Sequence, residues 1–155
     1  MLYRLYQPGD FAPLYAIEES CFQPPFRFSR AYMRQLVESE DTASWIAEDE
    51  GAMAGFAIVE WTDPPDAVAY IQTIEVAPQK RRLGIAGELL RLVEQSAGAA
   101  RATAIWLHVD AENAAAIRLY EAHGYECTGR QSNYYARGRA ALIYAKPLAK
   151  PAAAV

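Results

Sequence analysis

The stretch from Ile74 to Gly87 has the residue types and spacing that bind a phosphate. Its apolar start favours a strand that ends near Val76, a short basic turn with Arg81 and Arg82 follows, and Gly84 stands where a helix begins. The first amide groups of a helix lack partners and carry partial positive charge, and small residues let an anion approach them. The stretch therefore predicts a pyrophosphate site, with a solvated basic turn as the alternative.

Two other phosphate-binding loops do not fit this stretch. A Walker A loop needs Gly-Lys-Ser or Gly-Lys-Thr, which does not follow here, and the GxGxxG fingerprint of dinucleotide-binding domains is also missing. A different phosphate-bearing ligand is therefore expected.

Apolar spacing, caps and turn residues predict the elements that must position this stretch. Strands are expected at 2–6, 44–48, 53–62, 67–76, 103–109, 126–134 and 140–146, and helices at 11–22, after Ser29, at 83–97 and at 113–123. Asp10 and Ser29 are expected to cap the first two helices, residues 49–51 to form a hairpin turn, and Gly124 to end the last helix. This order, βααβββαβαββ, predicts an α/β fold with a mixed central sheet and helices on both faces.

A chain of 155 residues suits one domain, and neither a repeat nor a linker divides it. We expect a single domain over residues 1–148 and a flexible tail over 149–155. The net charge of −4 argues against a nucleic-acid partner. No apolar run approaches the ~18 residues of a membrane span, so no membrane contact is expected.

The cysteines and the N-terminus favour a cytoplasmic protein. Cys21 and Cys127 fit no metal or redox spacing, so we expect two free thiols and no metal. The start, Met1 to Arg4, lacks the layout of a secretory signal.

Two motifs resemble those of one family. Arg81 to Ala86 fits the R/Q-x-x-G-x-G/A pattern of the GCN5-related N-acetyltransferases, the GNAT family, and Asn113 to Tyr125 fits the family's N-x-x-A-x-x-x-Y-x-x-x-G-F/Y helix. The motifs stand in the family's order, and the predicted topology matches the family's over nearly the whole chain. The resemblance implies the GNAT fold, with acetyl-CoA as co-substrate.

The same resemblance implies which residues contact acetyl-CoA. The turn at residues 81–87 would hold the pyrophosphate, the strand before it would offer main-chain groups to the pantetheine arm, and the amide of Val76 would polarise the thioester carbonyl. Asn113 would contact CoA, and the hydroxyl of Tyr120 would lie beside the thioester sulfur. The alternatives from the residues alone are a helix N-cap for Asn113 and a core aromatic for Tyr120. The residues that the resemblance implies to contact acetyl-CoA are Ile74, Glu75, Val76, Arg81, Arg82, Leu83, Gly84, Ile85, Ala86, Gly87 and Asn113.

Three further runs resemble acetyltransferases that act on protein N-termini. The run that starts at Tyr70 and the run around His108 resemble NatE-type enzymes, in which a Tyr and a His together deprotonate the α-amine. The run from Ser132 to Tyr135 resembles that group and the bacterial ribosomal-protein-alanine acetyltransferases, whose tyrosine hairpin covers the peptide. The bacterial group usually has Glu where this chain has His108. The resemblance implies catalytic roles for Tyr70 and His108 and a peptide contact for Tyr134.

The residues suit an α-amine better than a lysine. At pH 7 about 15% of an α-amine with a pKa of ~7.8 is neutral, against about 0.04% of a lysine with a pKa of ~10.4, so a modest base is sufficient. Strand alternation puts Trp106 and His108 on one face, and Tyr70 and Gln72 on one face of the neighbouring strand. If these faces coincide, Tyr70 and His108 are expected to hold a water between them and the amine. Packing roles for both side chains stay open.

Tyr120 is expected to serve the leaving thiolate. A phenol with a pKa of ~10 is a weaker acid than a thiol with a pKa of ~8.5, so full proton transfer costs about 2 kcal/mol. A hydrogen bond to the developing thiolate is therefore as plausible as proton donation. His123 is expected only to sit at the C-terminal end of its helix.

The segment from Phe22 to Phe28 joins the first two helices and, by the resemblance, faces the first residues of a peptide. Its three aromatics and two prolines favour a stiff apolar rim. Phe22 and Pro24 are therefore assigned a substrate role, with packing of the segment onto the core as the alternative.

The function predicted from these features is acetyl transfer from acetyl-CoA to the α-amine of a protein N-terminus or peptide. Attack would be direct, in a ternary complex, because no suitably placed cysteine nucleophile is evident. A lysine or a small-molecule amine is the alternative acceptor. A non-catalytic acyl-CoA-binding regulatory module is the alternative from another class.

Overall fold

The structure, a computed structural model, describes residues 1–149, so the predicted tail lies outside the described residues from residue 150 onward. The element order is the predicted one. The strands are β1 (Leu2–Leu5), β2 (Thr42–Asp49), β3 (Ala52–Trp61), β4 (Ala69–Val76), β5 (Ala104–Asp110), β6 (Glu126–Ala136) and β7 (Arg139–Pro147). The helices are α1 (Phe11–Cys21), α2 (Arg30–Glu38), α3 (Ile85–Ala99) and α4 (Ala114–Ala122), with 3-10 turns η1 (Pro8–Asp10) and η2 (Pro78–Lys80).

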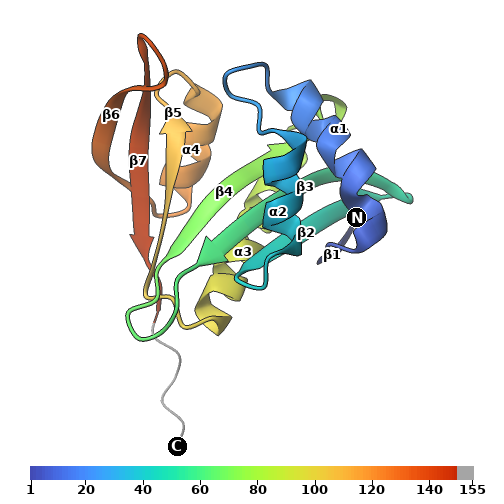
Figure 1. Cartoon of the computed structure of the whole chain (residues 1–155), viewed down its shortest axis with the longest axis horizontal. Coiled ribbons are helices and arrows are strands. Elements are labelled where there is room, and N and C mark those ends of the chain that lie inside the picture. Colours follow the sequence, from blue (N-terminus) through green and yellow to red (C-terminus); the bar gives the residue numbers. More distant parts are fainter. Residues whose placement is uncertain (150–155) are drawn as a thin grey trace, which may run out of the picture.

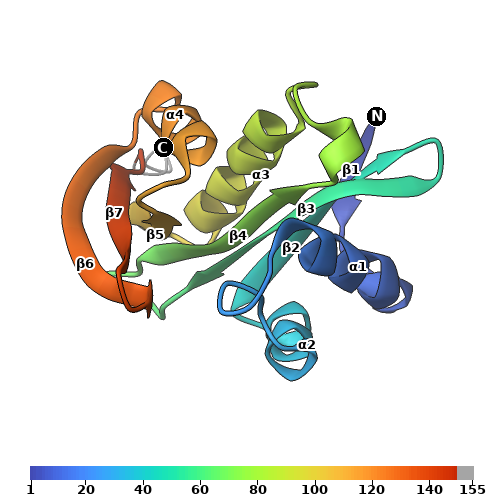
Figure 2. The ribbon, with the colours of Figure 1, turned by 90° about the horizontal axis from the view of Figure 1, so that it is seen from above.

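The strands form one seven-stranded mixed sheet in the order β1-β2-β3-β4-β5-β7-β6. Helices α1 and α2 cover one face, and α3 covers the other (Figures 1 and 2). The α3 side of the sheet holds one buried cluster, around Leu89 and Ile105. The α1–α2 side holds a second cluster, around Leu14 and Met33. This architecture confirms the predicted GNAT-type α/β fold. None of the helices within residues 1–149 combines the length and the apolar character needed to cross a bilayer.

Strands β4 and β5 pair only where both begin. Their parallel register holds Ala69 opposite Ile105 and Tyr70 opposite Trp106, and no later pair is formed between the two described strands. Figure 1 shows the strands close at their N-terminal ends and diverging toward their C-terminal ends. The main-chain groups of β4 that face β5 beyond Tyr70 are therefore left for other partners.

A bulge in β4 sets which side chains face this gap. Ile71 and Thr73 pair with successive residues of β3, which leaves Gln72 between them without a partner. Ile71 before the bulge and Ile74 after it both pack on the α3-side cluster. Tyr70 and Thr73 consequently line the same cleft on the opposite face, although strict alternation would separate residues three positions apart.

Three of the four predicted local signals are confirmed. The hydroxyl of Ser29 accepts the amide of Tyr32 at 3.1 Å, as an N-cap does. Gly124 ends the last helix with a φ of 87°, and a two-residue turn at residues 50–51 joins β2 and β3. The cap predicted at Asp10 is wrong. Its carboxylate binds Arg4 at 2.7 Å and makes no cap hydrogen bond to α1, because the ion pair takes the side chain toward β1.

Candidate active site

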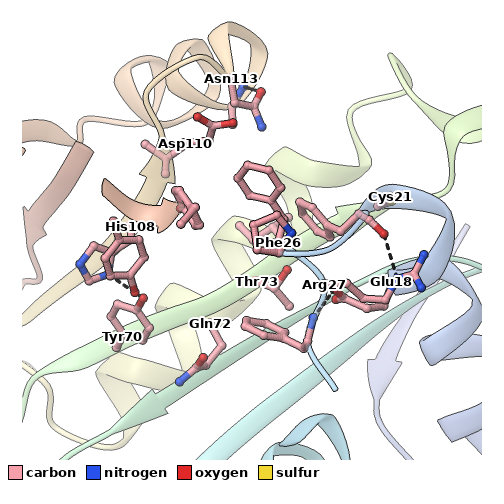
Figure 3. A pocket seen from close by; sticks show the side chains of 18 of the residues that line it. Glu18, Cys21, Phe26, Arg27, Tyr70, Gln72, Thr73, His108, Asp110 and Asn113 are labelled. Atoms are coloured by element: carbon pink, nitrogen blue, oxygen red, sulfur yellow. Dashed lines mark hydrogen bonds between the residues drawn. The ribbon is translucent and has the colours of Figure 1, made fainter. Parts of the chain in front are cut away.

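The gap between β4 and β5 opens into a cleft of about 1530 Å³. Its walls come from β4, β5, the start of α4, the segment between α1 and α2, and the hairpin of β6 and β7 (Figure 3). Seven of the residues predicted to contact substrate or cofactor line it: Phe22, Tyr70, Ile74, His108, Asn113, Tyr120 and Tyr134. Pro24 is exposed and lies outside the lining, so the structure does not bring it to the site.

The predicted phosphate cradle, residues 81–87, follows β4 and η2. Helix α3 begins at Ile85 rather than at residue 83, because Gly84 has a φ of 80°, which glycine adopts without strain. Within the described chain, the amides of residues 81–87 donate to no main-chain carbonyl. A Cβ added to Gly84 would meet no atom within 4 Å. Free amides beside open space, at the positive end of a helix, fit the pyrophosphate of CoA.

The basic side chains around the cradle have different partners. Lys80 binds Asp49 at 2.7 Å, which fastens η2 to the hairpin of β2 and β3. Arg81 turns back toward β4 and donates from Nε to the carbonyl of Val76 at 3.3 Å. Arg82 and Leu83 are exposed. Arg82 is therefore the guanidinium placed to approach an anion at the cradle.

His123 closes the helix that carries Tyr120. Its Nδ1 lies 2.8 Å from the carbonyl oxygen of Leu119, as expected for a residue at a helix C-terminus. Its ring lies against the first turn of α3, where a Cβ on Gly87 would be 3.4 Å from Nε2. The glycine at 87 thus lets α3 and α4 approach each other beside the cradle.

The main chain at the end of β4 is arranged to meet a thioester. The amide of Ala77 donates to the carbonyl of Ala54 at 2.8 Å, so the adjacent pair Val76–Gly55 is of the non-hydrogen-bonded kind. The amide of Val76 therefore points away from β3, toward the gap, as does the main chain of Ile74 two residues earlier. Preorganised amides of this kind stabilise the negative charge that develops on a carbonyl oxygen.

Glu75 departs from its predicted role. It lies between these two residues, so its main chain pairs with Phe56 of β3 instead of facing the gap. Its side chain is buried on the α1 side of the sheet. Glu75 is thus not positioned to contact a pantetheine arm through its backbone.

Tyr120 and Asn113 enter the cleft from α4. Tyr120 is only 7% exposed, and burial raises the pKa of its phenol above the usual range. Because a higher pKa weakens an acid, the structure favours a hydrogen bond from Tyr120 to a developing thiolate over full proton donation. Asn113 caps α4, since its Oδ1 accepts the amide of Ala116 at 3.1 Å. The N-cap role is confirmed, and the CoA contact of Asn113 stays a prediction.

Tyr70 and His108 meet directly on the cleft wall. The hydroxyl of Tyr70 lies 2.8 Å from Nδ1 of His108, so the two side chains are bonded directly to each other. The water expected between this pair and the amine stays a prediction. Trp106 packs edge-on against both rings, at 4.6 Å and 5.2 Å between centroids. The predicted faces of β4 and β5 therefore coincide, and the pair forms a phenol–imidazole unit open to the cleft (Figure 3).

A chain of contacting aromatic rings runs along the cleft wall from β5 to the segment between α1 and α2. Tyr134 stacks on His108 with 4.2 Å between centroids and an interplanar angle of 11°. Tyr135 contacts Tyr134 at 4.8 Å and Phe26 at 4.9 Å, which joins the hairpin to the segment between α1 and α2. The sequence offered an aromatic segment and a tyrosine hairpin but no signal that Phe26 and Tyr135 touch, because that contact depends on the sheet order.

A buried acid pair underlies the same segment. Glu18 of α1 and Glu75 of β4 are 0% and 3% exposed, and each has one carboxylate oxygen without a hydrogen-bond partner in residues 1–149. Burial and the neighbouring Glu18 raise the pKa of Glu75 well above its ordinary value. The other oxygens are bonded, since Thr73 donates to Glu75 at 2.6 Å and the amide of Phe28 donates to Glu18 at 3.0 Å. Burial beside a second acid therefore favours the neutral form of Glu75.

The remaining charges of the cleft leave one acid without a cation. Arg139 binds Asp110 at 3.0 Å and Glu112 at 3.1 Å, so one guanidinium is shared by the two acids near α4. Glu60, directly opposite Tyr70 on β3, accepts a hydrogen bond from Gln72 and has no cationic partner among residues 1–149. The cleft beside the phenol–imidazole pair therefore favours an acceptor that arrives as an ammonium ion.

Residues 11–125 match the model of the acetyltransferase (GNAT) family. This range includes the cradle and the helix that carries Tyr120. The chain belongs to the GNAT acetyltransferase family. Within residues 1–149, no group of three or more His, Cys, Asp or Glu is arranged to hold a metal ion.

Two curated relatives of this GNAT chain are named acetyltransferases. Histone acetyltransferase MCC1 of Arabidopsis thaliana is 26% identical over 157 residues, which cover 86% of this chain and 63% of MCC1. Streptothricin acetyltransferase of Streptomyces lavendulae is 33% identical over 115 residues, which cover 71% of this chain and 60% of that enzyme. The GNAT chain thus spans about three fifths of the length of these relatives.

Solved structures share the fold over nearly the whole chain. The ribosomal-protein-S18-alanine N-acetyltransferase of Escherichia coli superposes with a TM-score of 0.83 at 26% identity, covering 99% of this chain and 97% of that one. Arabidopsis thaliana NAA60 in complex with acetyl-CoA has a TM-score of 0.83 at 23% identity, covering 95% and 98%. At 23% identity, the likeness to NAA60 shows only that the two chains share a fold.

The first prediction concerns the cradle. Gly84→Val places a β-branched residue at a φ of 80° and a side chain in the space that a phosphate would enter. We expect the dissociation constant of CoA, measured by calorimetry, to rise roughly 10-fold or more, because tenfold corresponds to about 1.4 kcal/mol of binding. Gly138→Val, at a φ of 77° in the turn between β6 and β7, is the control with equal strain. Unchanged CoA affinity in Gly84→Val would place the pyrophosphate elsewhere.

The second prediction concerns the acid pair. Because the pKa of Glu75 is raised, the folded protein keeps a proton that the unfolded chain loses above about pH 4.3. The free energy of unfolding should therefore fall as the pH rises from that value toward the raised pKa. Glu75→Gln removes this fall, so its Tm should exceed that of the wild type at pH 8 and approach it at pH 5. The gain is roughly 2–4 °C per kcal/mol for a chain of this length.

Thermal unfolding between pH 5 and pH 8 checks the second prediction, with the exposed Glu126→Gln as the control. Parallel Tm curves for the wild type and Glu75→Gln would show that folding does not raise the pKa of Glu75.

Proposed function

We propose that this chain is an acetyl-CoA-dependent N-acetyltransferase that acts on the α-amine of a protein or peptide N-terminus. The observation that carries the proposal is the hydrogen-bonded Tyr70–His108 pair on the wall of the cleft. A phenol–imidazole unit is a modest base, and an α-amine needs only a modest base because a fraction of it is already neutral near pH 7.

The shape of the cleft supports a peptide acceptor. Tyr134 covers one face of the His108 ring, and the contact between Phe26 and Tyr135 adds apolar side chains to the cleft wall. A cleft lined by aromatic side chains suits an extended N-terminal chain. The E. coli structure, the likeness at 26% identity over nearly the whole chain, is that of a ribosomal-protein-S18-alanine N-acetyltransferase, which supports the same acceptor class.

Each reacting group has a counterpart in the chain. The amide of Val76 would stabilise the thioester carbonyl oxygen, and the hydroxyl of Tyr120 would donate to the sulfur. Tyr70 and His108 would take the proton of the amine. Direct attack is favoured, since Cys21, although it lines the cleft, has no base hydrogen bonded to its thiol within residues 1–149 and donates to the carbonyl of Val76.

A small amine is the second candidate acceptor. Glu60 lacks a cation, which suits a polycationic ligand, and the relative at 33% identity is named a streptothricin acetyltransferase. This candidate uses the same cradle and the same Tyr120. It differs only in what occupies the acceptor half of the cleft.

The third prediction separates these acceptors. Peptides with one internal lysine, prepared with free and with formylated N-termini, are incubated with the chain and acetyl-CoA beside a streptothricin sample. Mass spectrometry should find acetyl groups on the α-amines of the free peptides and none on the formylated ones. Acetylation of the formylated peptides would contradict the proposal. Acetylation of streptothricin without acetylation of any peptide would contradict it as well. Absence of thiol release with every amine, despite CoA binding, would indicate a non-catalytic module.

The fourth prediction tests the leaving-group contact. Tyr120→Phe removes the hydroxyl and keeps the buried ring, so kcat should fall roughly 10²-fold, as for other lost donors to a developing negative charge, while the KM for acetyl-CoA stays near the wild-type value. Tyr125→Phe is the matched control. It removes the hydroxyl that donates to Glu94 at 2.7 Å, next to Tyr120, and should lower Tm without lowering kcat. Equal kcat losses in both variants would assign Tyr120 a packing role.

A further inference from the structure

The imidazole of His108 has both ring nitrogens engaged. Its Nδ1 lies 2.8 Å from the hydroxyl of Tyr70, and its Nε2 lies 2.7 Å from Oε1 of Gln131 on β6. One face of the ring is covered by Tyr134. No ring nitrogen of His108 is therefore left to meet an amine in the cleft.

The partners of His108 decide where its hydrogen sits. A carbonyl oxygen only accepts, so the Gln131 oxygen requires a hydrogen on Nε2. In the neutral ring Nδ1 then has a lone pair and accepts the hydroxyl hydrogen of Tyr70. The lone pairs of the Tyr70 oxygen remain available to the cleft.

Other groups around the pair keep Tyr70 protonated at rest. Burial, together with Tyr134 beside it, raises the pKa of the Tyr70 phenol. Glu60 lies opposite Tyr70 on β3, and Asp110 of β5 is paired with Arg139 of β7, which also binds Glu112. Tyr70 is consequently a neutral hydroxyl at rest and not a phenolate. It can take a proton from the amine only as it gives its own proton to His108.

We propose that Gln131 is a positioning residue: it holds His108 with the hydrogen on Nε2, so that the oxygen of Tyr70 is the atom that takes the proton from the acceptor amine. This inference rests on the proposed acetyl transfer to an amine, but it holds for either acceptor class. The N–H bond of the ammonium breaks as an O–H bond forms on Tyr70. The original O–H bond of Tyr70 breaks as N–H forms at Nδ1, and the imidazolium keeps its Nε2 hydrogen on Gln131. The amine is left neutral, with its electron pair free for the thioester carbonyl carbon.

Two substitutions test the positioning role through pH profiles of kcat/KM between pH 5 and pH 9. Gln131→Leu cannot accept the Nε2 hydrogen, so the plateau should fall about 10- to 100-fold, within the range that general acid–base catalysis supplies, with the KM for acetyl-CoA unchanged. Gln131→Glu still accepts and adds a negative charge that stabilises the imidazolium. Its acid limb should move up by roughly one pH unit while the plateau is largely kept. Arg130→Gln, an exposed neighbour on β6, is the control.

A second readout needs no activity. The chain has two histidines, and their partners predict opposite neutral forms, with the hydrogen on Nε2 in His108 and on Nδ1 in His123, which donates to the carbonyl of Leu119. Nitrogen-15 NMR of the ring nitrogens should show this difference in the wild type and its loss at His108 in Gln131→Leu. His108→Ala assigns the signals.

The outcomes separate this inference from the proposed function. Wild-type pH profiles in both Gln131 variants, or a hydrogen on Nδ1 of His108 in the wild type, would overturn the role of Gln131 even if peptides are acetylated. The predicted NMR pattern without acetylation of any amine would support the arrangement and overturn the proposed function instead.

Discussion

The short pairing of β4 with β5 is the constraint on which the site depends. Two residue pairs hold the strands together, and their divergence leaves main-chain groups at Ile74 and Val76 without sheet partners. Unpaired backbone groups in a protein interior are costly, so they persist where a ligand or water can satisfy them. A sheet closed along its full length would bury these groups in a ladder and leave neither a thioester contact nor a cleft.

The two halves of the cleft are built in different ways. The half proposed to bind acetyl-CoA comes from one stretch of chain, β4 through the start of α3, together with α4, and so it appears as motifs of fixed spacing. The acceptor half joins Phe26, His108 and Tyr135, which are distant in sequence and meet through single aromatic contacts. The donor half therefore depends on main-chain groups that are close in sequence, and the acceptor half on contacts between distant side chains.

The same distinction explains what the sequence could predict. Ser29 and Gly124 act through neighbouring residues, and both were identified correctly. The cap predicted at Asp10 was wrong because its carboxylate pairs with Arg4. Helix start signals in the sequence do not reveal such an ion pair. The bulge at Gln72 and the contact of Gln131 with His108 depend on strand register, which apolar spacing does not encode. The Tyr70–His108 pair was found because resemblance supplied the long-range information that spacing lacked.

The buried acids show how the acceptor rim stays open. Apolar side chains in place of Glu18 and Glu75 would pack without the cost of burying charge. The acid pair offers instead a directional bond, since Glu18 accepts the amide of Phe28 at the end of the segment between α1 and α2. At the other end, Arg27 donates to the carbonyl of Phe22 at 2.9 Å. Polar anchors at both ends hold the segment so that Phe22 and Phe26 line the cleft, while Phe28 also packs on the α1–α2-side cluster. Burying the acid pair thus lowers the stability of the fold. In return, the segment that the pair anchors presents apolar side chains to the acceptor.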